Sequence, residues 1–229
     1  LRIEDNRQIR ATSIANCCLD ETNTRFLTKF LDVTKSQMFF SSGVVLVEGI
    51  SEALLLPALA ERVGSGYDIL KYGIEIVNIG GVAFEHFGKL FNHGDPGRRL
   101  PVRCAILTDN DRREDGEVSP RAERASELRG GNLEVFLAER TFEFELYRTG
   151  SNSTLMRSLF SQMHSRRSEQ LMEPDGSEDE ALEFVQAVSD CKAKSELAHR
   201  LSVALTASDV EFAVPGYIGR AIEWVLGSE

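Results

Sequence analysis

The 229-residue chain has few of the residues that build zinc fingers, disulfide frameworks and membrane spans. Its four cysteines (17, 18, 104 and 191) form no Cys-x-x-Cys pair, and among its four histidines only His86 and His93 lie near each other. These spacings predict neither a zinc site nor a disulfide framework. No apolar run approaches the roughly 20 residues that cross a bilayer. We therefore expect no membrane partner and a reducing, cytoplasmic location.

Basic residues are also scarce. Lys and Arg number 26 against 36 Asp and Glu, which gives a formal net charge of −10. Such a chain lacks the basic surface that accompanies tight binding to nucleic acid through phosphate contacts alone. A nucleic-acid substrate would therefore require something that offsets the carboxylates. The chain begins at Leu1 without an initiator Met or an apolar leader, which indicates an internal segment of a longer protein.

Apolar patterning predicts an α/β fold. Residues 44–47, 74–79 and 102–108 are β-branched or apolar runs typical of buried strands, and residues 133–137 form a weaker one. Helical patterns follow the first two strands, over residues 50–59 and 83–91. This alternation predicts a parallel sheet flanked by helices, with the site at the carboxyl ends of the strands.

The remaining segments predict the domain organisation. Residues 1–40 would be a helical lead-in from a preceding region, residues 41–146 the sheet-containing core, residues 147–191 a small all-helical insertion with a polar break at 173–180, and residues 192–229 C-terminal helices that complete the core. Residues 112–131 are charged and predict a loop plus a short polar helix. Arg157 and the basic stretch 164–167 could contact DNA, although a solvated helix face is the more usual reason for such residues.

The first and third predicted strands both end in acidic residues. Glu48 ends the first strand, Asp109 and Asp111 end the third, and Glu52 lies four positions after Glu48. Any one of these acids could cap a helix or face solvent, as most acids do. Together they predict a site for a hard cation, because carboxylate oxygens favour Mg²⁺ or Mn²⁺ and several carboxylates do not stay ionised together without a cation.

These segments resemble a known family. Residues 47–49 and 107–111 resemble the paired signatures of the Toprim fold, which topoisomerases, primases and certain nucleases share. The longer stretch 45–57 resembles the C-terminal region of OLD (overcoming lysogenization defect) family endonucleases. Three further segments resemble that family in the same order, namely residues 140–146, 194–198 and 215–225. Ser195 and Leu197 depart from the commonest residues of the second of these segments. The resemblance covers roughly residues 36–229.

The resemblance implies a Toprim-type sheet with a helical insertion and hydrolysis of DNA phosphodiesters with two divalent cations, Mg²⁺ or Mn²⁺, while Ca²⁺ can also bind. Glu48, Glu52 and Asp109, with Asp111, would hold one ion. Asp109, Thr141 and Glu143 would hold the other. Lys194 would neutralise charge in the transition state, so that Lys194 and Glu48 are the expected catalytic residues.

The same resemblance implies an N-terminal ATPase domain in the full-length protein. The chain itself has no Walker A motif: in the segment around Gly88-Lys89-Leu90, Ala83 and Leu90 occupy positions that the motif reserves for Gly and Ser or Thr. A homodimer is open, since no residue pattern shows one.

Two alternatives remain at this point. A primase or topoisomerase could use the same fold. A topoisomerase needs an active-site Tyr in a partner domain, and the four tyrosines here (67, 72, 147 and 217) have no evident link to the acids in the sequence. The other alternative is a non-catalytic module that binds metal and nucleic acid.

Overall fold

The computed structural model describes residues 2–3, 9–10, 12–31, 36–63, 66–80, 84–110, 118–207 and 210–227. Its elements, in chain order, are β1 (Arg2–Ile3), β2 (Ile9–Arg10), η1 (Ile14–Cys17), α1 (Glu21–Phe30), η2 (Gln37–Phe40), β3 (Gly43–Val47), α3 (Ile50–Ala60), β4 (Ile74–Asn78), α4 (Glu85–Gly88), η3 (Pro96–Arg98), β5 (Arg103–Thr108), α5 (Pro120–Ser126), β6 (Leu133–Leu137), α6 (Phe142–Arg148), α7 (Asn152–Met163), α8 (Ser165–Ser168), α9 (Glu178–Asp190), α10 (Lys194–Ala207) and α11 (Gly216–Leu226).

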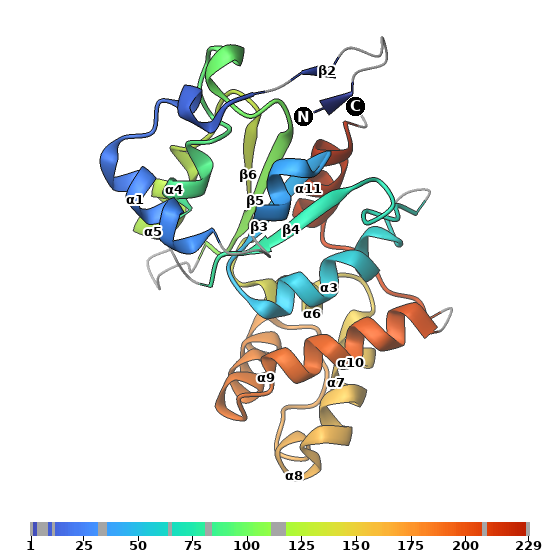
Figure 1. The fold of residues 1–229 in the computed structure, drawn as a ribbon. Coiled ribbons are helices and arrows are strands. Elements are labelled where there is room, and N and C mark those ends of the chain that lie inside the picture. The colour runs from blue at the N-terminus through green and yellow to red at the C-terminus, as the bar shows by residue number, and fades with distance from the viewer. Residues whose placement is uncertain are drawn as a thin grey trace.

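The centre of the molecule is a four-stranded sheet in the order β4-β3-β5-β6 (Figure 1). All three pairings are parallel, with Val45 opposite both Ile76 of β4 and Ala105 of β5. The four strands correspond to the four predicted ones, and the prediction of a parallel Toprim-type α/β fold is confirmed. Because the strands are parallel, the loops after β3, β5 and β6 leave the same edge of the sheet.

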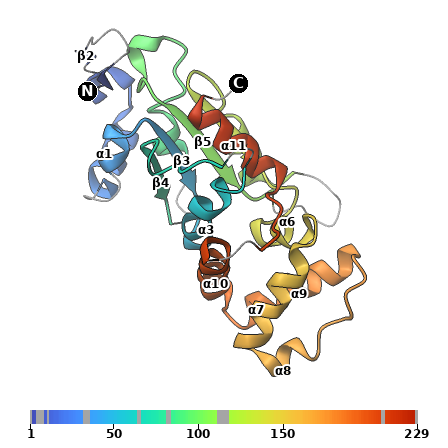
Figure 2. The same ribbon diagram turned by 90° about the vertical axis from the view of Figure 1, so that its right-hand side faces the viewer.

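Both faces of the inner strands are buried, which explains the continuous apolar run of β3 and the apolar centre of β5. Val44 and Leu46 point into a core shared with α1, α4 and α5. Val45 and Val47 point into the other core, which contains side chains of α3, α6, α7, α9, α10 and α11. Figure 2 shows α11 lying along β5 on this second face.

Predicted helix boundaries fit less well than predicted strands. The helical pattern at 83–91 corresponds to a short α4, and Ala83 lies outside the described residues. Phe87, Leu90 and Phe91 are buried as the pattern requires, but the last two lie in turns. Gly88 ends the helix where any Cβ would approach Leu128 and Leu133 to within 3.2 and 3.3 Å. A larger residue at Gly88 would therefore have to displace these two leucine side chains.

The helices α7, α8 and α9 form the part of the molecule farthest from β1 and β2 (Figure 1). The polar break predicted at 173–180 is shorter, because α9 begins at Glu178 with Ser177 as its cap. Glu180 within it is 2% exposed, and its Oε1 accepts hydrogen bonds from the Tyr147 hydroxyl and from Arg157 Nη1. Arg157 is thus paired with a buried acid while 17% of its side chain is exposed, and contact of Arg157 or of residues 164–167 with DNA stays a prediction. The domain boundaries at 40/41, 146/147 and 191/192 stay a prediction.

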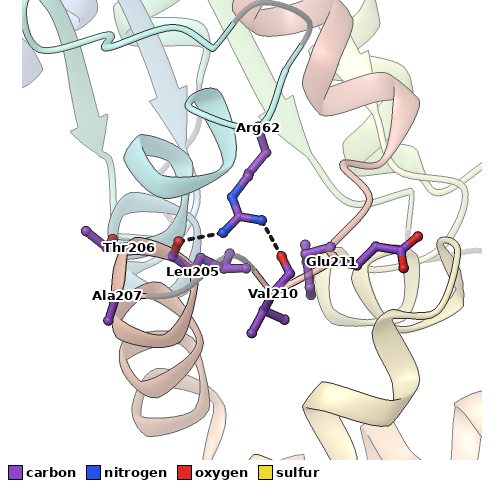
Figure 3. Close-up of a pocket in the computed structure, with 7 residues that line it drawn as sticks. Arg62, Leu205, Thr206, Ala207, Val210 and Glu211 are labelled. Carbon is purple, nitrogen blue, oxygen red and sulfur yellow. Dashed lines mark hydrogen bonds between the residues drawn. The ribbon is translucent and has the colours of Figure 1, made fainter.

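Arg62, just after α3, ties this helix to the end of α10. Its guanidinium donates to the Leu205 carbonyl at 2.7 Å and to the Val210 carbonyl (Figure 3). Terminal helix carbonyls lack intrahelical partners, so the charged donor satisfies a group that would otherwise be unpaired. A surface hollow of about 630 Å³ surrounds it. This hollow lies at the opposite end of α3 from Glu52.

Candidate metal centre

Glu48 and Asp109 follow two adjacent strands of the sheet. Glu48 comes directly after β3 and Asp109 directly after β5, and these strands pair in register through Leu46 and Ile106. Thr108, the last residue of β5, donates its hydroxyl hydrogen to Glu48 Oε1. The ends of β3 and β5 are therefore in direct contact next to Asp109, although the residue that bonds Glu48 is Thr108 rather than a predicted acid.

Glu52 lies in the first turn of α3 and turns back toward Glu48. A Cβ at Gly49 would approach Glu52 Oε2 to within 3.1 Å, so the absence of a side chain at Gly49 leaves room for the carboxylate. Burial raises the pKa of Glu52 above its ordinary value, and the charges of Glu143 and Glu48 raise it further. A hydrogen bond from its own backbone N–H and the charge of Lys194 oppose that rise. Glu52 is thus a partly desolvated acid among other acids, an environment that a bound cation would relieve.

The start of α6 brings two further predicted ligands to Asp109. Thr141 caps this helix by accepting the Phe144 N–H at Oγ1 over 3.3 Å, and Asp109 Oδ1 accepts the Phe142 N–H at 2.8 Å. Glu143 follows in the first turn and is buried. Negative charge is stabilised at a helix N-terminus, so α6 positions Asp109 as well as carrying Thr141 and Glu143.

Lys194 is the first residue of α10, and its Nζ lies 3.1 Å from Glu143 Oε2. Burial alone would lower the pKa of this ammonium group. The charge and hydrogen bond of Glu143, together with the charges of Asp109 and Glu52, outweigh burial and raise that pKa. The lysine is therefore held in its charged form beside three of the predicted ligands.

Two residues near the acids were not singled out by sequence. Arg121 on α5 forms an ion pair with Glu48 Oε2 at 2.7 Å. Tyr217 on α11 is buried near the acids. Burial raises its pKa well above the ordinary value, and the negative charges of nearby carboxylates, Asp109 most strongly, raise it further. The expectation that no tyrosine is linked to the acids is wrong for Tyr217. No local signal identified either residue, because α5 and α11 reach the acids only through the fold.

The structure thus brings together Glu48, Glu52, Asp109, Thr141, Glu143 and Lys194, whereas Asp111 lies outside the described residues. Among the residues that the structure describes, no group of three His, Cys, Asp or Glu side chains is placed to hold one metal ion. The acids instead bond to Thr108, Arg121, the start of α6 and Lys194. Their donor atoms nevertheless fit a hard divalent cation, because the set consists of carboxylate and hydroxyl oxygens.

Within the described ranges, no helix combines the length and the apolar composition needed to cross a membrane.

Comparisons with known proteins agree with this architecture. Residues 39–111 match the family described as "Overcoming lysogenization defect protein-like, TOPRIM domain". A search of curated proteins gave no match.

Solved structures extend the likeness over most of the chain. The C-terminal region of the Xanthomonas campestris pv. campestris OLD protein, phased with platinum, is 26% identical, with a TM-score of 0.57 over 84% of this chain and 95% of that one. The C-terminal region of the Burkholderia pseudomallei OLD protein is 21% identical, with a TM-score of 0.55 over 82% of this chain and 98% of that one. At the lower identity the likeness concerns the fold alone.

Proposed function

We propose that this chain, which carries an OLD-like TOPRIM domain on the fold of the C-terminal region of OLD proteins, is a metal-dependent nuclease that nicks or cleaves DNA. The observation that carries the proposal is the convergence of Glu48, Glu52, Asp109 and Glu143 at one edge of the sheet, as reflected in the raised pKa of Glu52. Such a cluster of partly buried carboxylates suits divalent cations.

The residues divide into two ligand sets. Glu48, Glu52 and Asp109, with Asp111, would hold one ion, and Asp109, Thr141 and Glu143 the other. When bound, a pair of divalent ions supplies Lewis acidity to the phosphate and lowers the pKa of the attacking water. Asp109 belongs to both sets, and its hydrogen bond from the Phe142 N–H holds it in a fixed orientation. Glu48 shares the catalytic role through its position at the end of β3.

Lys194 would stabilise the transition state. Its ammonium group donates to Glu143 in this structure, and its raised pKa keeps it charged at neutral pH. A fixed positive charge next to the reacting phosphate favours the extra negative charge that develops during hydrolysis. The part of Lys194 left exposed, 42% of its side chain, gives the substrate access to it.

Tyr217 gives no support to a topoisomerase, because its side chain is buried beside the carboxylates that are proposed to bind the cations. A primase is separated by an assay for ribonucleotide polymerisation, and a non-catalytic module by cation binding without turnover.

The test is cleavage of supercoiled plasmid by the purified chain with Mg²⁺, Mn²⁺ or Ca²⁺. Asp109→Asn should abolish nicking while the protein stays folded, because the amide oxygen can still accept the Phe142 N–H but no longer serves as an anionic ligand. Asp190→Asn, at an exposed position of α9, is the matched control and should nick like wild type. Absence of nicking by the wild-type protein with all three cations, or full activity of Asp109→Asn, would refute the proposal.

Two partners belong to the same proposal. DNA is the substrate, and an N-terminal ATPase domain of the full-length protein would control its cleavage. A homodimer is a further proposal, which sedimentation of the chain at several concentrations would test.

A further inference from the structure

The carboxylate of Glu48 is fully engaged by groups of the chain itself. Its Oε1 accepts the Thr108 hydroxyl hydrogen, and its Oε2 lies 2.7 Å from Arg121 Nη2. The side chain of Glu48 is 16% exposed and that of Arg121 is 39% exposed. The pair therefore joins a mostly buried carboxylate to a more exposed guanidinium.

A second acid of the centre has a similar partner. Lys194 Nζ lies 3.1 Å from Glu143 Oε2. Glu48 and Glu143 belong to the two different ligand sets of the proposed nuclease, so each set contains one acid neutralised by a basic side chain. Neighbouring ionised carboxylates repel one another. The positive charges of Arg121 and Lys194 reduce this repulsion, which would otherwise destabilise the fold.

Helix α5 does not need the ion pair to keep its place. Ser119 caps it by accepting the Ala122 N–H at 3.2 Å, and Ala122 and Ala125 are buried. Arg121 projects from this anchored helix to Glu48, which follows β3 and lies 73 positions earlier in the chain. An arginine held there by its helix, rather than by the pair itself, can leave Glu48 without unfolding its surroundings.

We propose that Arg121 is an internal counter-ion of Glu48, which a divalent cation must displace before it can bind Glu48 Oε2. The inference rests on the proposed function. Arg121 is then a positioning residue that sets the cation concentration at which the nuclease becomes competent. Guanidinium suits this role because it stays charged at all physiological pH values and forms a directional bond to carboxylate.

The experiment measures Mn²⁺ affinity by calorimetry, or by the loss of the free-ion signal in electron paramagnetic resonance, in the absence of DNA. Arg121→Gln should bind Mn²⁺ about fivefold more tightly than wild type. This change corresponds to about 1 kcal/mol at 1.4 kcal/mol per tenfold, which is the upper range for a partly exposed ion pair. Arg124→Gln is the matched control, because it removes the same charge from an exposed position one turn along α5. It should lie within about twofold of wild type, as screened charges do.

Arg121→Lys keeps the charge and tests geometry. A lysine at this position forms a less directional pair, and its Mn²⁺ affinity should lie between those of wild type and Arg121→Gln. This variant also retains the counter-charge, so it serves if Arg121→Gln does not fold, as judged by circular dichroism.

The outcomes separate the two proposals. If wild type binds Mn²⁺ and nicks DNA, but Arg121→Gln binds no more tightly than Arg124→Gln, the counter-ion inference is overturned and the nuclease proposal stands. If Arg121→Gln is unfolded, a Lys variant with wild-type affinity overturns the inference in the same way. If folded wild-type protein neither binds Mn²⁺ nor nicks, the nuclease proposal itself fails.

Discussion

Replacing Glu180 by Gln is expected to lower the free energy of unfolding by about 3 kcal/mol. Glu180 is 2% exposed and accepts hydrogen bonds from Tyr147, from Arg157 at 3.0 Å and from the Gly176 N–H at 3.2 Å. Gln preserves the shape but removes the charge, which leaves the largely buried guanidinium of Arg157 without its anion. Removing one partner of a buried pair costs about 3–5 kcal/mol. The lower end applies here because Arg157 also donates to the Met172 carbonyl at 2.7 Å.

The measurement is urea unfolding followed by circular dichroism, with a thermal scan as a second readout. For a domain of this size, 3 kcal/mol corresponds to a fall in Tm of about 6–12 °C. Glu178→Gln is the matched control, because this residue lies two positions earlier on α9, pairs with Arg140 and is 48% exposed. It should cost no more than about 1 kcal/mol. Equal losses for the two variants would refute the idea that burial makes the Glu180 network important.

Three further predictions concern stability. Glu52→Gln should have the same free energy of unfolding as wild type below about pH 4.3 and a higher one at pH 7 in EDTA. The reason is that a raised folded-state pKa of Glu52 gives wild type stability at low pH that is lost as the pH rises through that pKa. A constant difference between the two proteins from pH 4 to 7 in urea titrations would contradict this. Arg62→Gln should lower the free energy of unfolding in urea by about 1–3 kcal/mol, since it removes the charged donor to the Leu205 and Val210 carbonyls. An unchanged midpoint would show that water satisfies these carbonyls. Gly43→Ala should lower the free energy of unfolding by about 1–3 kcal/mol, because its Cβ would lie 2.8 Å from Ile74 Cδ1 and 3.0 Å from the Val225 carbonyl oxygen. A loss below about 0.5 kcal/mol, near the scatter of ordinary surface changes, would mean that α11 moves aside.

Sequence predicted the sheet well because strands buried on both faces leave a strong signal. Residues 44–47 are entirely apolar and residues 104–107 form a second apolar run, and all four strands lie where strands were predicted. Helix ends were harder to predict. Gly88, the last residue of α4, packs close to Leu128 and Leu133, which lie some 40 residues away and have no local signature.

The acids of the candidate site were predictable for a similar reason. Parallel strands deliver their C-terminal residues to one edge, so Glu48 and Asp109 meet wherever β3 and β5 pair. The residues that bond to them were not predictable. Arg121 lies in a charged stretch where every arginine has the same appearance in sequence, and only the placement of α5 distinguishes it from Arg124. Arg157 shows the converse, since a basic residue on an amphipathic helix pairs with a buried acid.

The candidate site is built on two supports of different kinds. Glu48 and Asp109 extend from β3 and β5, the inner strands, whose backbones are hydrogen-bonded on both sides. Glu143 and Lys194 extend from α6 and α10, which join the sheet mainly through side-chain packing, with the Asp109–Phe142 bond at the start of α6. Segments held in these two ways open with different free energies, and their amide hydrogens exchange at different rates. A cation bound between them would slow amide exchange in α6 and α10 more than in the strands. The candidate site would then link two groups of segments that otherwise open independently of each other.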